Sequence, residues 1–169
     1  MKTNVLLVCG VIALGLFSGM SVNGAPEVDG QLLARGRYLI AISGCNDCHT
    51  PGYLQNEGQT AESQWLTGSA VGFQGPWGTT YPSNLRLIMS RLIETQWLQK
   101  ARSPMRPPMP WFNLKAMNDA DLRAIYAYVR QLGPVGEPAP AYAAPGQTVM
   151  TPYFDFTPKN LPVTARNTE

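Results

Sequence analysis

One short motif limits the fold of this chain more than any other feature: Cys45-Asn46-Asp47-Cys48-His49. The C-x-x-C-H spacing is typical of a covalent haem-attachment site. Two thiols three positions apart can each form a thioether with one vinyl group of the same haem, and the imidazole of the next residue then lies under the iron as its proximal ligand. The motif therefore predicts one covalently bound haem c, held by Cys45, Cys48 and His49, with iron as the metal.

Two other kinds of site share part of this motif. A thioredoxin-like redox disulfide should follow a strand and open a helix inside a βαβ pattern, whereas the residues before Cys45 have a helical pattern. A structural zinc site usually needs four Cys or His ligands. The chain has three cysteines and one histidine, and Cys9 lies in a predicted export signal, so no closed zinc site can form within one chain. A redox disulfide remains the alternative to haem.

Residues 1–24 are predicted to be a signal peptide. Lys2 gives a positive start, the run from Val5 to Phe17 is apolar and uncharged, and small residues follow it. If the signal is not cleaved, the stretch from Val5 to Val22 is close to the shortest segment that can anchor a chain in a bilayer. The signal predicts export to the periplasm, with membrane contact only if it is uncleaved. Export agrees with the motif, because bacteria attach haem to thiols outside the cytoplasm.

The charge balance argues against a nucleic-acid-binding role. The chain has 13 lysines and arginines against 11 acidic residues, and cleavage of the signal removes Lys2. Such a nearly neutral chain has no basic excess with which to bind phosphates. We therefore expect no nucleic-acid partner.

The rest of the chain divides into one domain, residues 25–133, and an extended Pro-rich tail, residues 134–169. Three segments of the domain have helical periodicity, and the middle one is expected to break near Glu94-Thr95. The three segments are 28–43, 84–102 and 118–132. The last has a capping Asn118, an apolar stripe, and Gly133 as its end. These patterns predict an all-α domain with few helices.

Gly- and Pro-rich segments connect or follow these helices. Residues 68–82 and 103–110 are interpreted as irregular loops. The prolines of the tail exclude long helices there. The tail also carries aromatic residues, which indicate that part of it packs on a surface: Tyr142, Tyr153, Phe154 and Phe156.

A single histidine excludes a haem with two histidine ligands within this chain, so the second axial ligand is expected to be a methionine thioether. Three methionines are assigned to packing or to the distal tail: Met89, Met117 and Met150. Met105 and Met109 remain, in a Pro-rich loop. Met109 has a proline on each side, which restricts its backbone and lowers the entropic cost of offering its sulfur to iron. We favour Met109, with Met105 and a five-coordinate iron as the alternatives.

With these residues identified, the chain resembles the class I mono-haem c-type cytochromes of the bacterial periplasm. The resemblance rests on the order of a first helix, the motif ending at His49, Gly- and Pro-rich loops, Met109-Pro110, and a closing helix around residues 120–128. It implies the class I cytochrome c fold, in which the first and last helices cross with a small residue against an aromatic one. Gly36 is the expected small residue, and its expected partners are Ile125 and Tyr126, or Val129.

The resemblance also directs attention to the surroundings of the haem. Many members have a proline well after the histidine whose carbonyl orients the imidazole, but Pro51 follows His49 too closely for that role. Four aromatic residues are candidates for packing on the haem or for bonding to its propionates: Tyr53, Trp77, Tyr81 and Trp111.

The expected function is electron transfer, with iron cycling between Fe(II) and Fe(III) under His49 and Met109 ligation and with no catalytic residue. Its partners would be redox proteins, either a dehydrogenase or an oxidase, docking through a small interface. One alternative makes the chain the cytochrome subunit of a periplasmic dehydrogenase complex. Another is a haem enzyme or gas sensor with an open iron position. No acid–base pair supports that alternative, since Asn46 and Asp47 are interpreted as solvated loop residues.

Overall fold

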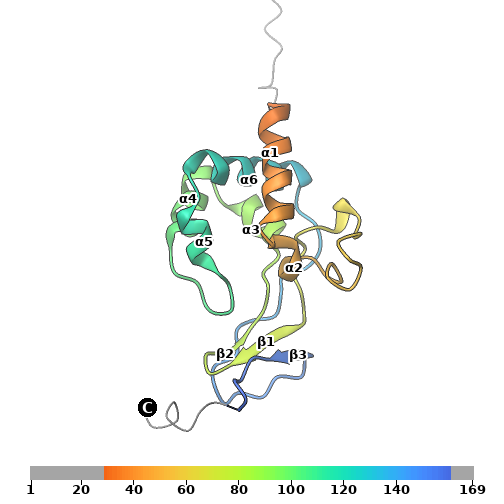
Figure 1. The fold of residues 1–169 in the computed structure, drawn as a ribbon, viewed down its shortest axis with the longest axis vertical. Coiled ribbons are helices and arrows are strands. Elements are labelled where there is room, and N and C mark those ends of the chain that lie inside the picture. Colours follow the sequence, from red (N-terminus) through yellow and green to blue (C-terminus); the bar gives the residue numbers. More distant parts are fainter. Residues whose placement is uncertain (1–28, 161–169) are drawn as a thin grey trace, which may run out of the picture.

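A computed structural model of the chain describes residues 29–160. The predicted signal, residues 1–24, and the end of the tail, residues 161–169, lie outside the described residues. Over the described range the chain forms six α-helices, and Figure 1 shows the helices above a small sheet. The helices are α1 (Gly30–Ile42), α2 (Cys45–His49), α3 (Leu85–Arg91), α4 (Glu94–Arg102), α5 (Trp111–Ala116) and α6 (Asp119–Leu132), with a 3-10 turn at Glu62–Gln64. The predicted helical segments are therefore confirmed.

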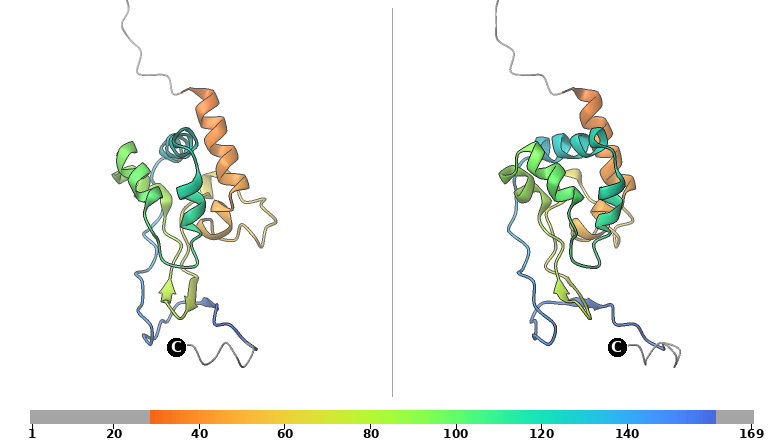
Figure 2. Two further views of the ribbon diagram at one scale, coloured as in Figure 1. Left: turned by 60° about the vertical axis from the view of Figure 1, so that its left-hand side comes forward. Right: turned by 90° about the vertical axis from the view of Figure 1, so that its left-hand side faces the viewer.

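Helices α1 and α6 cross at the end of the molecule away from the sheet (Figures 1 and 2). Each begins at a side-chain cap: Asp29 accepts a hydrogen bond from the backbone N–H of Gln31 at 2.9 Å, and Asn118 accepts one from that of Asp121 at 2.8 Å. The inward face of α6 is buried along its length and supplies much of the core: Leu122, Ala124, Ile125, Tyr128 and Val129. Burial of this face attaches α6 to α1 and α3.

Gly36 lies at the crossing, as expected, but the predicted partners are wrong. A Cβ atom built on Gly36 would lie 2.7 Å from the carbonyl carbon of Ala124 and 2.7 Å from Cβ of Tyr128. The contacting row is therefore Ala124 and Tyr128, four residues apart on α6, rather than Ile125 and Tyr126 or Val129. The reason is rotational: residues 125 and 129 face the interior of the domain, and the neighbouring row meets α1.

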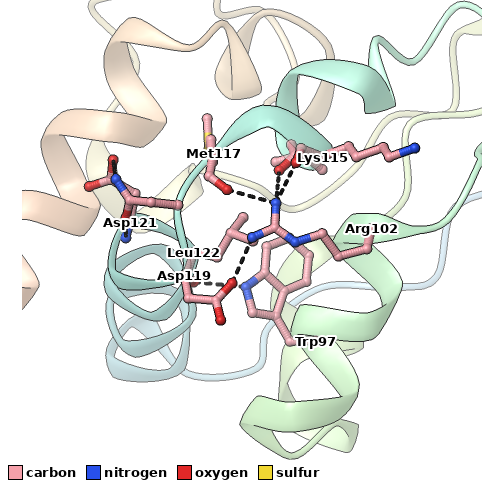
Figure 3. A network of polar contacts seen from close by, with 9 residues as sticks. Trp97, Arg102, Lys115, Met117, Asp119, Asp121 and Leu122 are labelled. Atoms are coloured by element: carbon pink, nitrogen blue, oxygen red, sulfur yellow. Dashed lines mark hydrogen bonds and ion pairs between the residues drawn. The ribbon is translucent and has the colours of Figure 1, made fainter.

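The middle segment breaks into α3 and α4 at Leu92-Ile93, two residues before the predicted position. Trp97 of α4 is buried and donates a hydrogen bond from Nε1 to the carbonyl of Leu122 at 2.8 Å. Arg102, at the end of α4, donates to the carbonyl of Met117 and to the carboxylate of Asp119, each at 2.6 Å (Figure 3). These contacts fix the junction between α5 and α6.

The segment 68–82, expected to be an irregular loop, instead contains a β-hairpin. Strands β1 (Gly72–Gly75) and β2 (Gly78–Thr80) pair antiparallel, with Phe73 opposite Thr80. Strand β3 (Tyr153–Asp155), from the Pro-rich tail, pairs with β1 in parallel to give the order β2-β1-β3. Phe73 stacks on Phe154 with ring centroids 5.7 Å apart. The described part of the tail, residues 134–160, is extended, as predicted, and packs on the hairpin.

Within residues 29–160, no helix has the length and apolar character needed to cross a membrane.

Candidate functional site

A cavity of about 420 Å³ lies between α2 and the loop that leads into α5. This volume is within the range of small-molecule and cofactor sites. Each of the helices α1 to α6 contributes to its wall, together with the hairpin and the tail. Its apolar side chains include Ile40, Leu66, Leu85, Met89, Trp97 and Ile125.

The two predicted thiols lie on one short helix at the edge of this cavity. Helix α2 begins after Gly44, which has φ +70°, a left-handed conformation that glycine adopts without strain. Burial, with a smaller contribution from Asp47, raises the pKa of the Cys45 thiol to about 11 and also raises that of Cys48. The two are not joined by a disulfide. Such protonated thiols lack the low pKa of catalytic redox cysteines, which argues against the redox alternative.

His49 ends α2 and lines the same cavity. Its Nδ1 lies 2.7 Å from the carbonyl oxygen of Ser83, so the Nδ1–H donates to the main chain and Nε2 keeps a free lone pair. Burial lowers the pKa of His49, and the hydrogen bond to Ser83 opposes that shift only in part. A neutral imidazole, oriented through its other nitrogen, is the form that binds metals.

Ser83 was not predicted from the sequence. Its carbonyl takes the orienting role for which Pro51 lies too close to the histidine. Every residue has a main-chain carbonyl, so no residue type marks this acceptor in the sequence, and the only sequence signal for Ser83 is indirect. Pro82 comes well after the histidine, and Ser83 follows Pro82 directly.

Asn46, interpreted as solvated, is instead fully buried. Its Oδ1 accepts a hydrogen bond from Oγ1 of Thr50 at 2.7 Å, and that hydroxyl accepts one from the backbone N–H of Leu66 at 2.8 Å. The interpretation failed because the short helix turns this side chain inward while Asp47 remains exposed. Asn46 thus attaches α2 to the following loop, a structural role.

Met105 and Met109 both line the cavity from the loop that precedes α5. The loop is attached to the hairpin where Oγ1 of Thr80 donates to the carbonyl of Pro107 at 2.7 Å. Met89 is fully buried in the core, as predicted. Met89 and Met117 also line the cavity, whereas Met150 is 96% exposed in the tail. The structure therefore brings both candidate sulfurs to the cavity that holds His49.

Of the four aromatic candidates, Tyr81 lines the cavity. The other three pack elsewhere: Tyr53 against Trp65, Trp77 against Phe156, and Trp111 against Phe112. Three aromatic residues that were not among these four candidates line it as well: Phe73, Trp97 and Tyr142. The positions of Phe73 and Tyr142 depend on the hairpin and on the path of the tail, which have no local sequence signature, whereas Trp97 lies on α4.

The residues around the cavity fit a covalently bound haem. Two unpaired thiols and an oriented neutral imidazole lie on one side, thioether sulfurs lie on the loop that precedes α5, and the walls between them are mainly apolar. Within residues 29–160, no group of three or more His, Cys, Asp or Glu side chains could hold a metal ion.

The family model for cytochrome c matches residues 33–133, which include α1 to α6 except the first turn of α1. The chain belongs to the cytochrome c family. Cytochromes of this family transfer electrons through a covalently bound haem c, so this cytochrome is an electron-transfer haem protein with haem c as its cofactor. Its mostly helical structure agrees with the class I cytochrome c fold.

This cytochrome is similar to parts of three larger proteins. Over 138 residues, 75% of the chain, it is 25% identical to the cytochrome c subunit of the quinone alcohol dehydrogenase of Gluconacetobacter polyoxogenes, of which it covers 27%. Over 125 residues, 67% of the chain, it is 26% identical to the fructose dehydrogenase cytochrome subunit of Gluconobacter japonicus, of which it covers 24%. Over 130 residues, 70% of the chain, it is 30% identical to a subunit of the nicotinate dehydrogenase of Pseudomonas putida, of which it covers 10%. The chain thus spans at most about a quarter of the length of these relatives. No solved structure matches the chain significantly.

Proposed function

We propose that this cytochrome is an exported, non-catalytic electron carrier of the periplasm. Cys45 and Cys48 form the two thioethers to the haem, His49 is the proximal iron ligand, and Met109 is the second axial ligand. The observation that carries the proposal is the hydrogen bond between Nδ1 of His49 and the carbonyl of Ser83, next to two unpaired thiols on the same cavity. It leaves Nε2 available for iron and fixes the plane of the ring.

The chain's own residues favour transfer of an electron without movement of a proton. Haem supplies a one-electron Fe(III)/Fe(II) couple when it is bound. His49 keeps its proton on Nδ1, from which it donates a hydrogen bond to the Ser83 carbonyl, and the lowered pKa of His49 disfavours a second proton. Met109 lies between two prolines that restrict its backbone. The mainly apolar walls of the cavity limit the access of water to this site.

Two of the relatives are named as cytochrome subunits of dehydrogenases, and the third as a dehydrogenase subunit. We propose on this basis that the electron donor is a periplasmic dehydrogenase and that the chain serves it either as a separate carrier or as a bound subunit. Co-purification of the exported cytochrome with a large flavin-, quinone- or molybdenum-containing subunit supports the bound form. Recovery of the cytochrome alone after gentle extraction supports the separate carrier.

Mass spectrometry and optical spectra of the exported protein test the central proposal. We expect the mass of the mature chain to be increased by one haem, and the reduced protein to be six-coordinate and low-spin. Rapid binding of carbon monoxide to the ferrous protein at neutral pH would show an open iron position and contradict the carrier assignment.

Met109→Ala and Met105→Ala distinguish the two candidate sulfurs. The ferric protein is expected to have the weak near-red absorption band of a thioether bound to iron. Met109→Ala should abolish that band. Met105→Ala, a loss of the same side chain from the same loop, should retain it. The opposite pattern would assign the ligand to Met105.

A further inference from the structure

The C-terminal tail crosses one end of the cavity. We call residues 134–156 the strap; it begins immediately after the region matched by the family, which ends at residue 133. In Figure 2 the strap descends from α6 to the sheet. Pro140 and Tyr142, near its middle, line the cavity. The strap therefore adds a wall that the family region does not supply.

Hydrogen bonds to main-chain atoms hold the strap along its length. Nδ2 of Asn84 donates to the carbonyl of Val135 at 2.8 Å. Thr79 and Ala143 exchange two backbone hydrogen bonds, at 2.8 and 3.0 Å. The hydroxyl of Tyr142 donates to the carbonyl of Trp77 at 2.8 Å. These bonds on both sides of position 142 place the Tyr142 ring at the cavity edge.

Arg106 lies against this ring. Its guanidinium carbon is 4.1 Å from the centroid of Tyr142, a cation–π distance, and Arg106 also lines the cavity. Within residues 29–160, Arg106 forms no ion pair with a carboxylate. Lys100 lines the cavity too, but no aromatic ring of the described residues holds its ammonium. A guanidinium held over a ring is restricted in position, and its planar fork of N–H groups suits a carboxylate.

We propose that Tyr142 positions Arg106 to bind a propionate carboxylate of the haem, so that the strap closes the propionate end of the cavity. The inference rests on the proposed function, because it needs a haem attached to the motif on α2. Arg106 is a positioning and charge-compensating residue and takes no part in ligating iron. Its positive charge opposes the additional positive charge of ferric haem and therefore raises the midpoint potential.

Arg106→Gln tests this assignment in the full-length haem-loaded protein, with Lys115→Gln as the matched control. Lys115 carries the same charge and also lies over an aromatic ring, 5.8 Å from the centroid of Trp111, but does not line the cavity. The resonance Raman bending band of the propionates reports their hydrogen bonding. We expect Arg106→Gln to shift this band and to change the Fe(III)/Fe(II) equilibrium by about threefold to tenfold toward Fe(III), where tenfold is about 59 mV for one electron. Lys115→Gln should leave the band unchanged.

The remaining outcomes separate this inference from the proposed function. A wild-type protein without attached haem defeats the proposed function. Attached haem with the same propionate band in Arg106→Gln as in the wild type overturns the inference alone, even if reaction with a redox partner slows. Should Arg106→Gln not mature, Tyr142→Leu carries the test, because it removes the ring beneath the guanidinium. Tyr142→Leu is expected to shift the band in the same direction, and an unchanged band overturns the inference.

Discussion

Substitution of Gly36 by alanine tests whether the crossing of α1 and α6 determines stability. The added Cβ would lie 2.7 Å from the carbonyl carbon of Ala124 and from Cβ of Tyr128. The carbonyl oxygen of Ala124 would be closer still. An ordinary contact is about 3.4 Å or longer, so the helices must separate by more than roughly 0.7 Å, which forfeits at least about a quarter of the dispersion energy at the contact. The displaced atoms belong to a backbone and a Cβ, which cannot rotate away. We therefore expect an overpacking cost near the upper end of about 1–3 kcal/mol.

Alanine also gains about 1 kcal/mol over glycine in helix propensity, so the net expected loss of unfolding free energy is about 2 kcal/mol. Urea denaturation of the haem-loaded protein measures it as a lower midpoint at constant slope. Gly30→Ala is the matched control, because nothing lies within 4 Å of a Cβ at Gly30 on the same helix. We expect no loss there. A Gly36→Ala protein as stable as the wild type would refute the argument from the close helix crossing.

Three further changes test other parts of the structure. Arg86→Met should lower the unfolding free energy, measured by urea denaturation, by about 3 kcal/mol. The buried guanidinium donates to three main-chain carbonyls, which lose their charged partner in this variant. A loss under about 1 kcal/mol would contradict this role of Arg86. Burial raises the pKa of Glu62. Hydrogen bonds donated by Tyr128 and by Arg37 of α1 outweigh this effect and hold the pKa of Glu62 below its ordinary value of 4.5. The Glu62 carboxylate therefore stabilises the fold above this pH, and that contribution is lost as the pH falls through the folded-state pKa. Glu62→Gln should accordingly be less stable than the wild type at about pH 6 and should lose less stability toward about pH 3, as followed by denaturation midpoints; parallel pH profiles would contradict this. Gly78→Ala should release the strap, because the carbonyl of Ala143 occupies the space of a Cβ there, and limited proteolysis should cut the strap faster than in the wild type. Unchanged proteolysis would contradict the close approach.

The features predicted correctly from the sequence have local causes. Helix α6 has a side-chain cap at Asn118, an apolar face with helical period, and Gly133 directly after its last residue. Each signal lies within the helix or beside it, and so the helix could be placed closely. The motif from Cys45 to His49 is equally local, which is why its spacing alone predicts haem c, the cofactor of the family.

The features that were missed depend on contacts between distant segments. Strand β1 pairs with a strand about 80 residues later in the chain, and neither segment has a strong strand pattern. Which residues of α6 contact Gly36 depends on how α1 crosses α6. Shifting the expected contact by one residue along α6 changes every contacting residue. Asn46 is buried because the loop that contains Leu66 folds over α2, which no periodicity around the motif indicates.

The orientation of His49 depends on an atom that every amino acid possesses. Because its Nδ1 meets the main-chain oxygen of Ser83, exchange of the serine side chain leaves the acceptor in place, and a scan by point replacement would not detect the contact. Evolution can alter this contact by rerouting the chain between Pro82 and Asn84, through an insertion or a deletion. The orientation of the imidazole is thus set by the path of the main chain. The residue at position 83 can change without altering that orientation.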